Sequence, residues 1–294
     1  MSIWRTVDLA FVDGNCGSRV LTTTRKSEVS KEIGEVYKLD ELSDSNSKKL
    51  FHSITFRGEE KHPCSDELDK VSDTIIKKCR GLPLAIVTIA EVLARKPIEE
   101  WSNVYNSIGF GPDDNKVEDM KKILSFSYYD LPSHLRTCLL YLSTSPEEYL
   151  IEKRELILRW IAEGFIHEER GKASFDVGDN YIHELIDRNL VIPVEDKRSG
   201  ILQGCRVHDM LLRLIRQLST EENFAVAQDN DERSLVEQSK IRRLTLRTLT
   251  KETNYKDMPR LRSFNAIICF TELIPPVCSF KVLRVLVLEY CIGM

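Results

Sequence analysis

The chain has 294 residues, enough for about two ordinary domains, and its 42% hydrophobic and 30% charged residues are typical of a soluble globular protein. The formal net charge of −4 gives no excess of basic residues with which to hold nucleic acid or an anionic membrane surface. Charge therefore favours protein or small-molecule partners.

Cysteine usage and hydropathy indicate a cytoplasmic protein. The eight cysteines are scattered, and neither they nor the six histidines have the spacing of a metal site. No basic segment followed by an unbroken apolar run marks a secretory signal, so we expect a reducing compartment. The most apolar run, residues 81–94, contains Glu91 and is shorter than the ~20 residues of a membrane span. It is predicted to be a buried helix.

The first sixty residues have the pattern of the end of an α/β domain. Residues 18–25 (SRVLTTTR) are rich in β-branched side chains and predict a buried strand, and residues 36–39 predict a second one. Residues 42–56 predict a helix capped by Ser43 or Asp44. A parallel sheet needs more strands than these, so we expect an incomplete α/β remnant.

Helices dominate the next part of the chain, and a small hairpin near its end predicts a winged helix. Two β-like runs, residues 190–194 and 201–207, are joined by the turn-prone segment 196–200. Apolar residues at helical spacing predict the following helices: 68–76, 82–93, 123–128, 135–142, 156–165, 181–186 and 209–218.

A short repeat occupies the end of the chain. The pattern LxxLxL starts at Ile241, Leu261 and Leu283, which lie 20 and 22 residues apart, within the leucine-rich-repeat range. Three turns of a solenoid are therefore expected. Each repeat buries its apolar face against a neighbour, so we expect the last one to be left without a cap.

Five short motifs, in this order along the chain, resemble one family: residues 17–25 (GSRVLTTTR), 81–85 (GLPLA), 138–149 (CLLY followed by SPEEY), 159–165 (RWIAEGF) and 207–209 (VHD). They are similar to the NB-ARC region of plant NLR disease resistance proteins of the coiled-coil class, shortened at both ends. The last motif departs from the family's Met-His-Asp by having Val207, an apolar exchange that should leave the polar chemistry unchanged.

The resemblance implies four domains: the C-terminal part of a nucleotide-binding α/β domain (1–62), a helical subdomain with the GLPL motif (63–116), a winged-helix subdomain with the MHD-like motif (117–232) and the first leucine-rich repeats (233–294). The expected fold class is thus an α/β remnant, then mainly α-helical and winged-helix subdomains, then the start of a leucine-rich-repeat solenoid.

The same resemblance implies four nucleotide-binding residues. Arg25 would sense the γ-phosphate of ATP, Leu82 and Pro83 would pack on the adenine, and His208 would contact the β-phosphate of ADP and hold the winged helix closed. Simpler roles exist for each of them. Arg25 could be a solvent-exposed strand end, Leu82 and Pro83 a helix start, and His208 a helix cap beside Asp209.

The chain contains no GxxxxGK[ST] phosphate loop and no acidic strand for Mg²⁺. We therefore expect no catalytic residue, no metal-binding residue and no hydrolysis of ATP. We also expect this chain alone to bind ADP or ATP weakly or not at all. The chain is expected to be a fragment of a plant immune receptor, and that receptor would act as an ADP/ATP-dependent signalling switch in defence. Its partners would be a pathogen effector, a guarded host protein or other immune receptors.

Two other functions remain open at this stage. A nucleotide-free decoy or adaptor would bind other immune receptors, and retained partner binding without nucleotide affinity would favour it. DNA binding by the winged helix ranks last, because residues 168–196 contain eight acidic and three basic side chains that would on balance repel phosphates.

Overall fold

The computed structural model describes residues 21–24, 36–56, 66–110, 115–228, 240–247, 258–274 and 280–293, which fall in two compact units, residues 1–41 and 42–294. In the first unit, residues 21–24 and 36–41 form neither helix nor strand and are exposed, with Tyr37 85% and Leu39 84% accessible. The predicted strand at 36–39 is therefore wrong: no described strand pairs with its backbone. The other predicted strand, 18–25, is irregular at 21–24 and otherwise lies outside the described residues.

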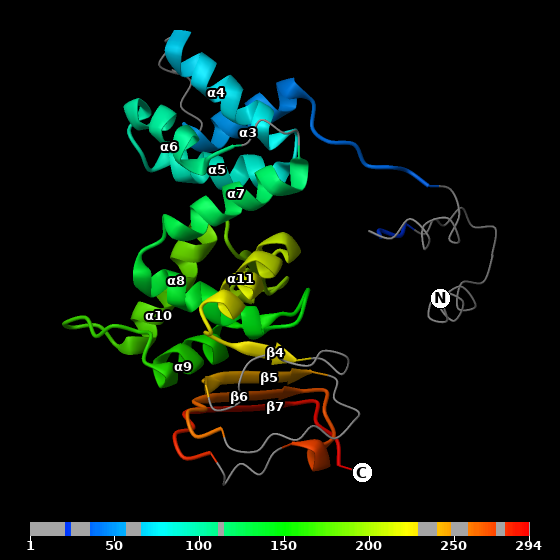
Figure 1. Ribbon diagram of the computed structural model, residues 1–294, viewed down its shortest axis with the longest axis vertical. Coiled ribbons are helices and arrows are strands. Elements are labelled where there is room, and N and C mark those ends of the chain that lie inside the picture. Colours follow the sequence, from blue (N-terminus) through cyan, green and yellow to red (C-terminus); the bar gives the residue numbers. More distant parts are fainter. Residues whose placement is uncertain are drawn as a thin grey trace. The chain divides into compact units, whose positions relative to one another are not determined.

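The second unit begins with a group of helices that the apolar spacing largely predicted (Figure 1). Ser43 caps the first of them, its Oγ accepting a hydrogen bond from the Asn46 N–H at 3.3 Å. The short helix α6 was not predicted, although it buries Trp101 and Val104 on one face. The helices are α3 (Asp44–Thr55), α4 (Asp66–Cys79), α5 (Pro83–Ala94), η1 (Ile98–Glu100), α6 (Trp101–Ile108) and α7 (Lys116–Tyr129).

A winged helix follows, as predicted from the hairpin. Its small antiparallel sheet has the order β1-β3-β2, and the two-residue strand β1 was too short to be found in the sequence. Helix α11 buries Leu211, Leu214 and Ile215 on the face that the spacing indicated. The elements are α8 (Ser133–Tyr141), η2 (Leu142–Thr144), β1 (Ile151–Glu152), α9 (Lys153–Glu163), α10 (Ser174–Asp187), β2 (Ile192–Glu195), β3 (Leu202–Arg206) and α11 (Asp209–Glu221).

The last part is a parallel sheet of order β4-β5-β6-β7, in the register that the repeat predicts. Leu244 pairs with Phe264, which pairs with Leu286. The first two are completely buried, whereas Leu286 on the outermost described strand is 45% exposed. The elements are β4 (Val226–Gln228), β5 (Arg243–Arg247), β6 (Ser263–Ile267), η4 (Thr271–Leu273) and β7 (Val285–Glu289).

Two apolar cores hold the second unit together. One runs from Phe51 in α3 to Leu218 in α11 and has Trp160 completely buried within it. The other lies within the repeat strands around Leu244 and Phe264. Because the cores are separate, contacts between the winged helix and the repeat strands depend on other side chains, which are described next.

Candidate functional site

The structure describes three of the four sequence-predicted site residues, and these lie at the starts of two helices. Arg25 lies outside the described residues. Leu82 and Pro83 open helix α5, and His208 precedes helix α11. Helices α5 and α11 both pack against α7 (Figure 1), so these two predicted contact points share one neighbouring helix.

The start of helix α5 presents one exposed apolar ring. Pro83 occupies the first helical position, where its missing N–H removes no hydrogen bond, and its side chain is exposed. Leu82 is half-buried and packs against the core. The preceding Gly81 has φ of 68°, and its carbonyl accepts a hydrogen bond from the Leu42 N–H at 3.0 Å. This turn is therefore fixed against the start of α3.

His208 is itself the N-cap of helix α11, which is the simpler role that the sequence also allowed for it. Its Nδ1 accepts a hydrogen bond from the Met210 N–H at 3.2 Å, and Asp209 is the first helical residue. When neutral, the imidazole then carries its proton on Nε2. The His208 side chain is exposed. Val207 beside it is buried, which suits an apolar residue.

A polar cluster that sequence reasoning missed joins the winged helix to the repeat strands. Glu163 at the end of α9 forms an ion pair with Arg243 of β5, with 2.7 Å between Oε2 and Nη2, and accepts a hydrogen bond from the Ser263 hydroxyl in β6. The two charged side chains are 0% and 6% exposed. The Arg243 guanidinium also lies over the rings of Phe224, at 4.1 Å, and Phe165, at 5.0 Å.

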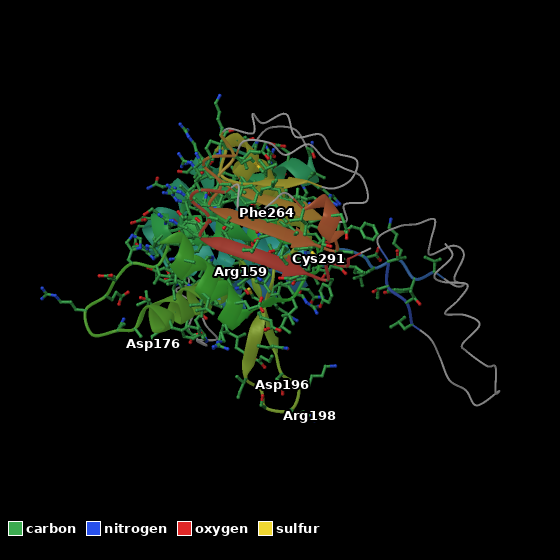
Figure 2. The ribbon with its side chains drawn as sticks, turned by 90° about the horizontal axis from the view of Figure 1, so that it is seen from below. Arg159, Asp176, Asp196, Arg198, Phe264 and Cys291 are labelled. Atoms are coloured by element: carbon green, nitrogen blue, oxygen red, sulfur yellow. The ribbon has the colours of Figure 1, made fainter. Side chains whose placement is uncertain are left out.

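A second set of contacts runs along strand β7. Arg159, one turn before Glu163 on α9, pairs with Glu289 at 2.9 Å, and the Tyr149 hydroxyl donates to the same carboxylate. Burial, followed by this hydrogen bond, raises the pKa of Tyr149. Arg284 donates to the Glu163 main-chain oxygen at 3.3 Å. Figure 2 shows Arg159 beside the repeat strands. The RWIAEGF motif, residues 159–165, thus forms much of this contact.

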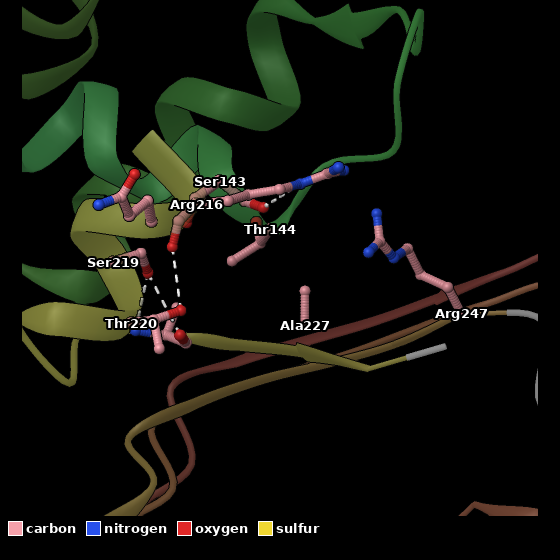
Figure 3. Close-up of a pocket in the computed structure, with 9 residues that line it drawn as sticks. Ser143, Thr144, Arg216, Ser219, Thr220, Ala227 and Arg247 are labelled. Atoms are coloured by element: carbon pink, nitrogen blue, oxygen red, sulfur yellow. Dashed lines mark hydrogen bonds between the residues drawn. The ribbon is translucent and has the colours of Figure 1, made fainter. Parts of the chain in front are cut away.

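An open cavity of about 320 Å³ lies between the end of α11, η2 and strands β4 and β5 (Figure 3). The Ser219 hydroxyl in this cavity is occupied by backbone contacts: its Oγ donates to the Ala225 oxygen and accepts from the Ala225 N–H, each at 3.2 Å. Arg216 at its rim donates to the Ser145 oxygen at 2.7 Å. The groups in this cavity therefore serve mainly to hold the chain after α11.

Two of the described cysteines have properties that disfavour reactivity. Cys79 and Cys205 are buried free thiols, and burial raises the pKa of each to about 12. Across the described parts of the chain, no group of three or more His, Cys, Asp or Glu side chains could hold a metal ion. No helix within those same parts is long and apolar enough to cross a membrane.

Comparison with known proteins gives one consistent result. The family description "Disease resistance protein Winged helix domain" matches residues 145–215. The chain is 31% identical over 304 aligned residues to disease resistance protein RGA5 of rice, covering 98% of this chain and 27% of that protein. It is 33% identical to rice disease resistance protein Pik-2, over 83% of this chain and 25% of that protein.

A dicot relative extends this similarity. Disease resistance protein RPP13 of Arabidopsis thaliana is 36% identical over 224 residues, or 75% of this chain and 26% of that protein. The chain thus spans about a quarter of the length of the curated relatives it matches. The matched winged-helix segment contains strands β1 to β3, helices α9 and α10, and His208. The chain belongs to the NLR family of plant disease resistance proteins.

Proposed function

We propose that this chain is part of a cytoplasmic plant immune receptor that switches between ADP-bound and ATP-bound states. The observation that carries the proposal is the place of His208, an exposed residue that caps α11 through Nδ1 directly after the wing. A donor at this junction links a phosphate contact to the position of the winged helix. One charge-assisted hydrogen bond of about 1.5–3 kcal/mol is enough to shift a two-state equilibrium substantially.

In this proposal the nucleotide is held only in part by the residues of this chain. Pro83 offers an exposed apolar ring of the kind that packs on a purine, His208 offers one donor, and Arg25 would add a permanent positive charge. The phosphate loop and the Mg²⁺-binding acid have no counterpart among the 294 residues. We therefore expect ADP to bind this chain weakly and we assign it no catalytic role.

We further propose that strands β5, β6 and β7 belong to the first turns of a leucine-rich-repeat solenoid that contacts protein partners. Their parallel register and the 20- and 22-residue spacing support this. Cys269 and Cys291 add support, because they stand at the asparagine-or-cysteine position of the repeat. Their Sγ atoms lie 3.6 and 3.4 Å from the main-chain oxygens of Leu246 and Ala266 in the preceding strand. The partner would be a pathogen effector, a guarded host protein or another receptor.

The wing argues against the alternative of DNA binding. Asp196 at its tip accepts hydrogen bonds from the Ser199 and Arg198 N–H groups and the Ser199 hydroxyl, and these lower the pKa of its carboxyl group. Figure 2 shows Asp196 and Arg198 together at the tip. An ionised carboxylate at this point would face the DNA phosphates and repel them.

The test uses the rice relative Pik-2 with its matching segment exchanged for this chain, expressed transiently in leaf tissue. His208→Ala and His208→Asn both remove the Nε2 donor, so both are expected to increase cell death at matched protein levels. His183→Ala is the control, since His183 is an exposed histidine on α10 whose polar contacts among the described residues are with Asp179 of the same helix. If the His208 variants and the control give the same cell death as the parent exchange, His208 does not hold the switch.

A further inference from the structure

Arginine recurs at the same place at the start of three successive repeat strands. Strand β5 is directly preceded by Arg242, β6 by Arg262 and β7 by Arg284. The Arg262 N–H donates to the Arg242 oxygen, and the Arg284 N–H donates to the Arg262 oxygen, each at 2.7 Å. Because paired strands lie about 4.8 Å apart, these residues form a column across the sheet that is about 10 Å long.

The arginine column lines a groove of about 320 Å³. A fourth arginine, Arg260, enters the lining from the turn before β6. The remaining lining residues are apolar, and none of the described residues that line the groove is acidic. The lining consists of Arg242, Pro259, Arg260, Arg262, Val282 and Arg284.

Among the described residues, no carboxylate forms an ion pair that would balance the charges of Arg242, Arg260 and Arg262 in the groove. Arg284 makes one hydrogen bond, to the neutral main-chain oxygen of Glu163. The Glu163 carboxylate is itself occupied by Arg243 and Ser263. Four like charges around one small groove repel each other, and an anion bound among them would be attracted to all four.

We propose that this groove binds a compact polyphosphate, a small molecule that carries several phosphate groups close together. The planar guanidinium group donates paired hydrogen bonds that match phosphate oxygens, and four of them exceed what a single carboxylate or sulfate can use. The four arginines line one groove of about 320 Å³, a size that suits a compact ligand better than the extended backbone of a nucleic acid. The site lies on the repeat strands and does not depend on the proposed nucleotide switch.

The experiment titrates the full 294-residue chain with inorganic tripolyphosphate by calorimetry at low ionic strength. One saturable site with micromolar affinity is expected. The double variant Arg242→Gln/Arg260→Gln should weaken binding about tenfold or more, since two charge-assisted contacts are lost. Arg154→Gln/Arg170→Gln is the matched control, because it removes the same charge from two exposed arginines outside the groove. This control should change affinity by less than about twofold, through long-range charge alone.

A second pair of variants separates binding from folding. Arg242→Lys/Arg260→Lys keeps both charges but loses the forked donors, so it should bind more tightly than the Gln variant and less tightly than the parent chain. The thermal unfolding of all variants without ligand should agree, because Arg242 and Arg260 are exposed. A Gln variant that binds as the parent does, while folding normally, would overturn the assignment of the site.

The remaining arms identify the chemical class and its source. Equal affinity for orthophosphate, equal weakening by the control variant, or tighter binding of a single-stranded oligonucleotide through the same arginines would each refute a compact polyphosphate site. Soluble inositol trisphosphate is compared with phosphatidylcholine vesicles that carry phosphatidylinositol bisphosphate. Binding to both, with competition by tripolyphosphate, indicates a lipid head group as the source. Binding of the soluble compound alone indicates a free metabolite.

Discussion

The Glu163 carboxylate in α9 and the Arg243 guanidinium in β5 form a buried ion pair across 80 residues of sequence, with 2.7 Å between Oε2 and Nη2. Removing both charges from water is costly, and contacts with neighbouring groups offset part of that cost. Ser263 donates to Glu163, while Phe224 contributes its ring and its main-chain oxygen to Arg243. The pair therefore fixes how the winged helix meets the first repeat strands.

Replacing Glu163 with Gln should strongly destabilise the chain. Arg243 would keep its charge in a buried place without a counter-charge, and the free energy of unfolding should fall by about 3 kcal/mol. This value is at the low end for a broken buried ion pair, because the Gln amide still accepts one hydrogen bond. The urea midpoint of unfolding measures this. The double variant Glu163→Gln/Arg243→Met removes the unpaired charge and should recover part of the loss.

A surface ion pair provides the control for this experiment. Glu169 pairs with Lys172 at 2.6 Å, but both side chains are about half exposed. Glu169→Gln should therefore cost less than about 1 kcal/mol. If Glu163→Gln and Glu169→Gln shift the midpoint equally, the buried pair does not hold the two parts together.

Replacing Gly204 with Ala should break the small sheet of the winged helix. A Cβ at this position in β3 would lie 2.2 Å from the Ile151 main-chain oxygen, so β1 must move away from β3. We expect a loss of about 1–3 kcal/mol, typical of overpacking. Gln203→Ala, at the exposed neighbouring position, should have a much smaller effect. Amide hydrogen exchange at Cys205 reports on the pairing, and unchanged protection in Gly204→Ala would contradict the prediction.

The helices and the repeat register could be predicted because their signal is local. Apolar spacing located α11 and its buried Leu211 and Ile215, and the LxxLxL pattern located the paired positions Leu244 and Phe264. The strand expected at 36–39 failed for the opposite reason. Its side chains suit a strand, but a strand also needs a partner for its backbone, and none of the described strands provides one.

The candidate site was predictable in outline only. The family motifs pointed to Leu82, Pro83 and His208, but the sequence could not show that His208, rather than Asp209, caps α11. The cluster around Glu163 and Arg243 depends on residues 80 positions apart, which no local pattern connects. The RWIAEGF motif was the only available signal, and its sequence does not reveal which neighbour it contacts.

Acidification should destabilise the winged helix through His134. Partial burial, and then repulsion by His167, lowers the pKa of His134, while Glu184 and Glu169 oppose the shift. Its ring also stacks on Tyr181, with 4.7 Å between centroids. Above pH 6.5, the ordinary value, both states are neutral and this stability is fully present. As pH falls from 6.5 through the folded-state pKa, the unfolded chain takes up the proton first and stability is lost.

Thermal unfolding measured between pH 8 and pH 5 tests the role of His134, with the pH range chosen to span histidine titration at about 6.5. His134→Gln should reduce the slope of stability against pH in the acid range. His183→Gln is the matched control, since His183 is exposed on α10 and contacts the Asp179 main-chain oxygen of its own helix. A slope that His134→Gln leaves unchanged would rule out His134 as the titrating group.

The capping role of His208 can be separated from any role toward a ligand by two substitutions in the 294-residue chain. His208→Ala removes the acceptor for the Met210 N–H and should cost about 1 kcal/mol, within the 0.5–2 kcal/mol usual for a lost N-cap. His208→Asn keeps a good capping acceptor and should stay within about 0.5 kcal/mol of the parent chain. Urea unfolding followed by circular dichroism gives both values. Equal losses in the two variants would mean that the Nδ1 contact does not stabilise α11. We expect the His208→Asn variant to be as stable as the parent chain and the His208→Ala variant to be less stable. His208→Asn is then the variant that removes the Nε2 donor while leaving the helix start intact.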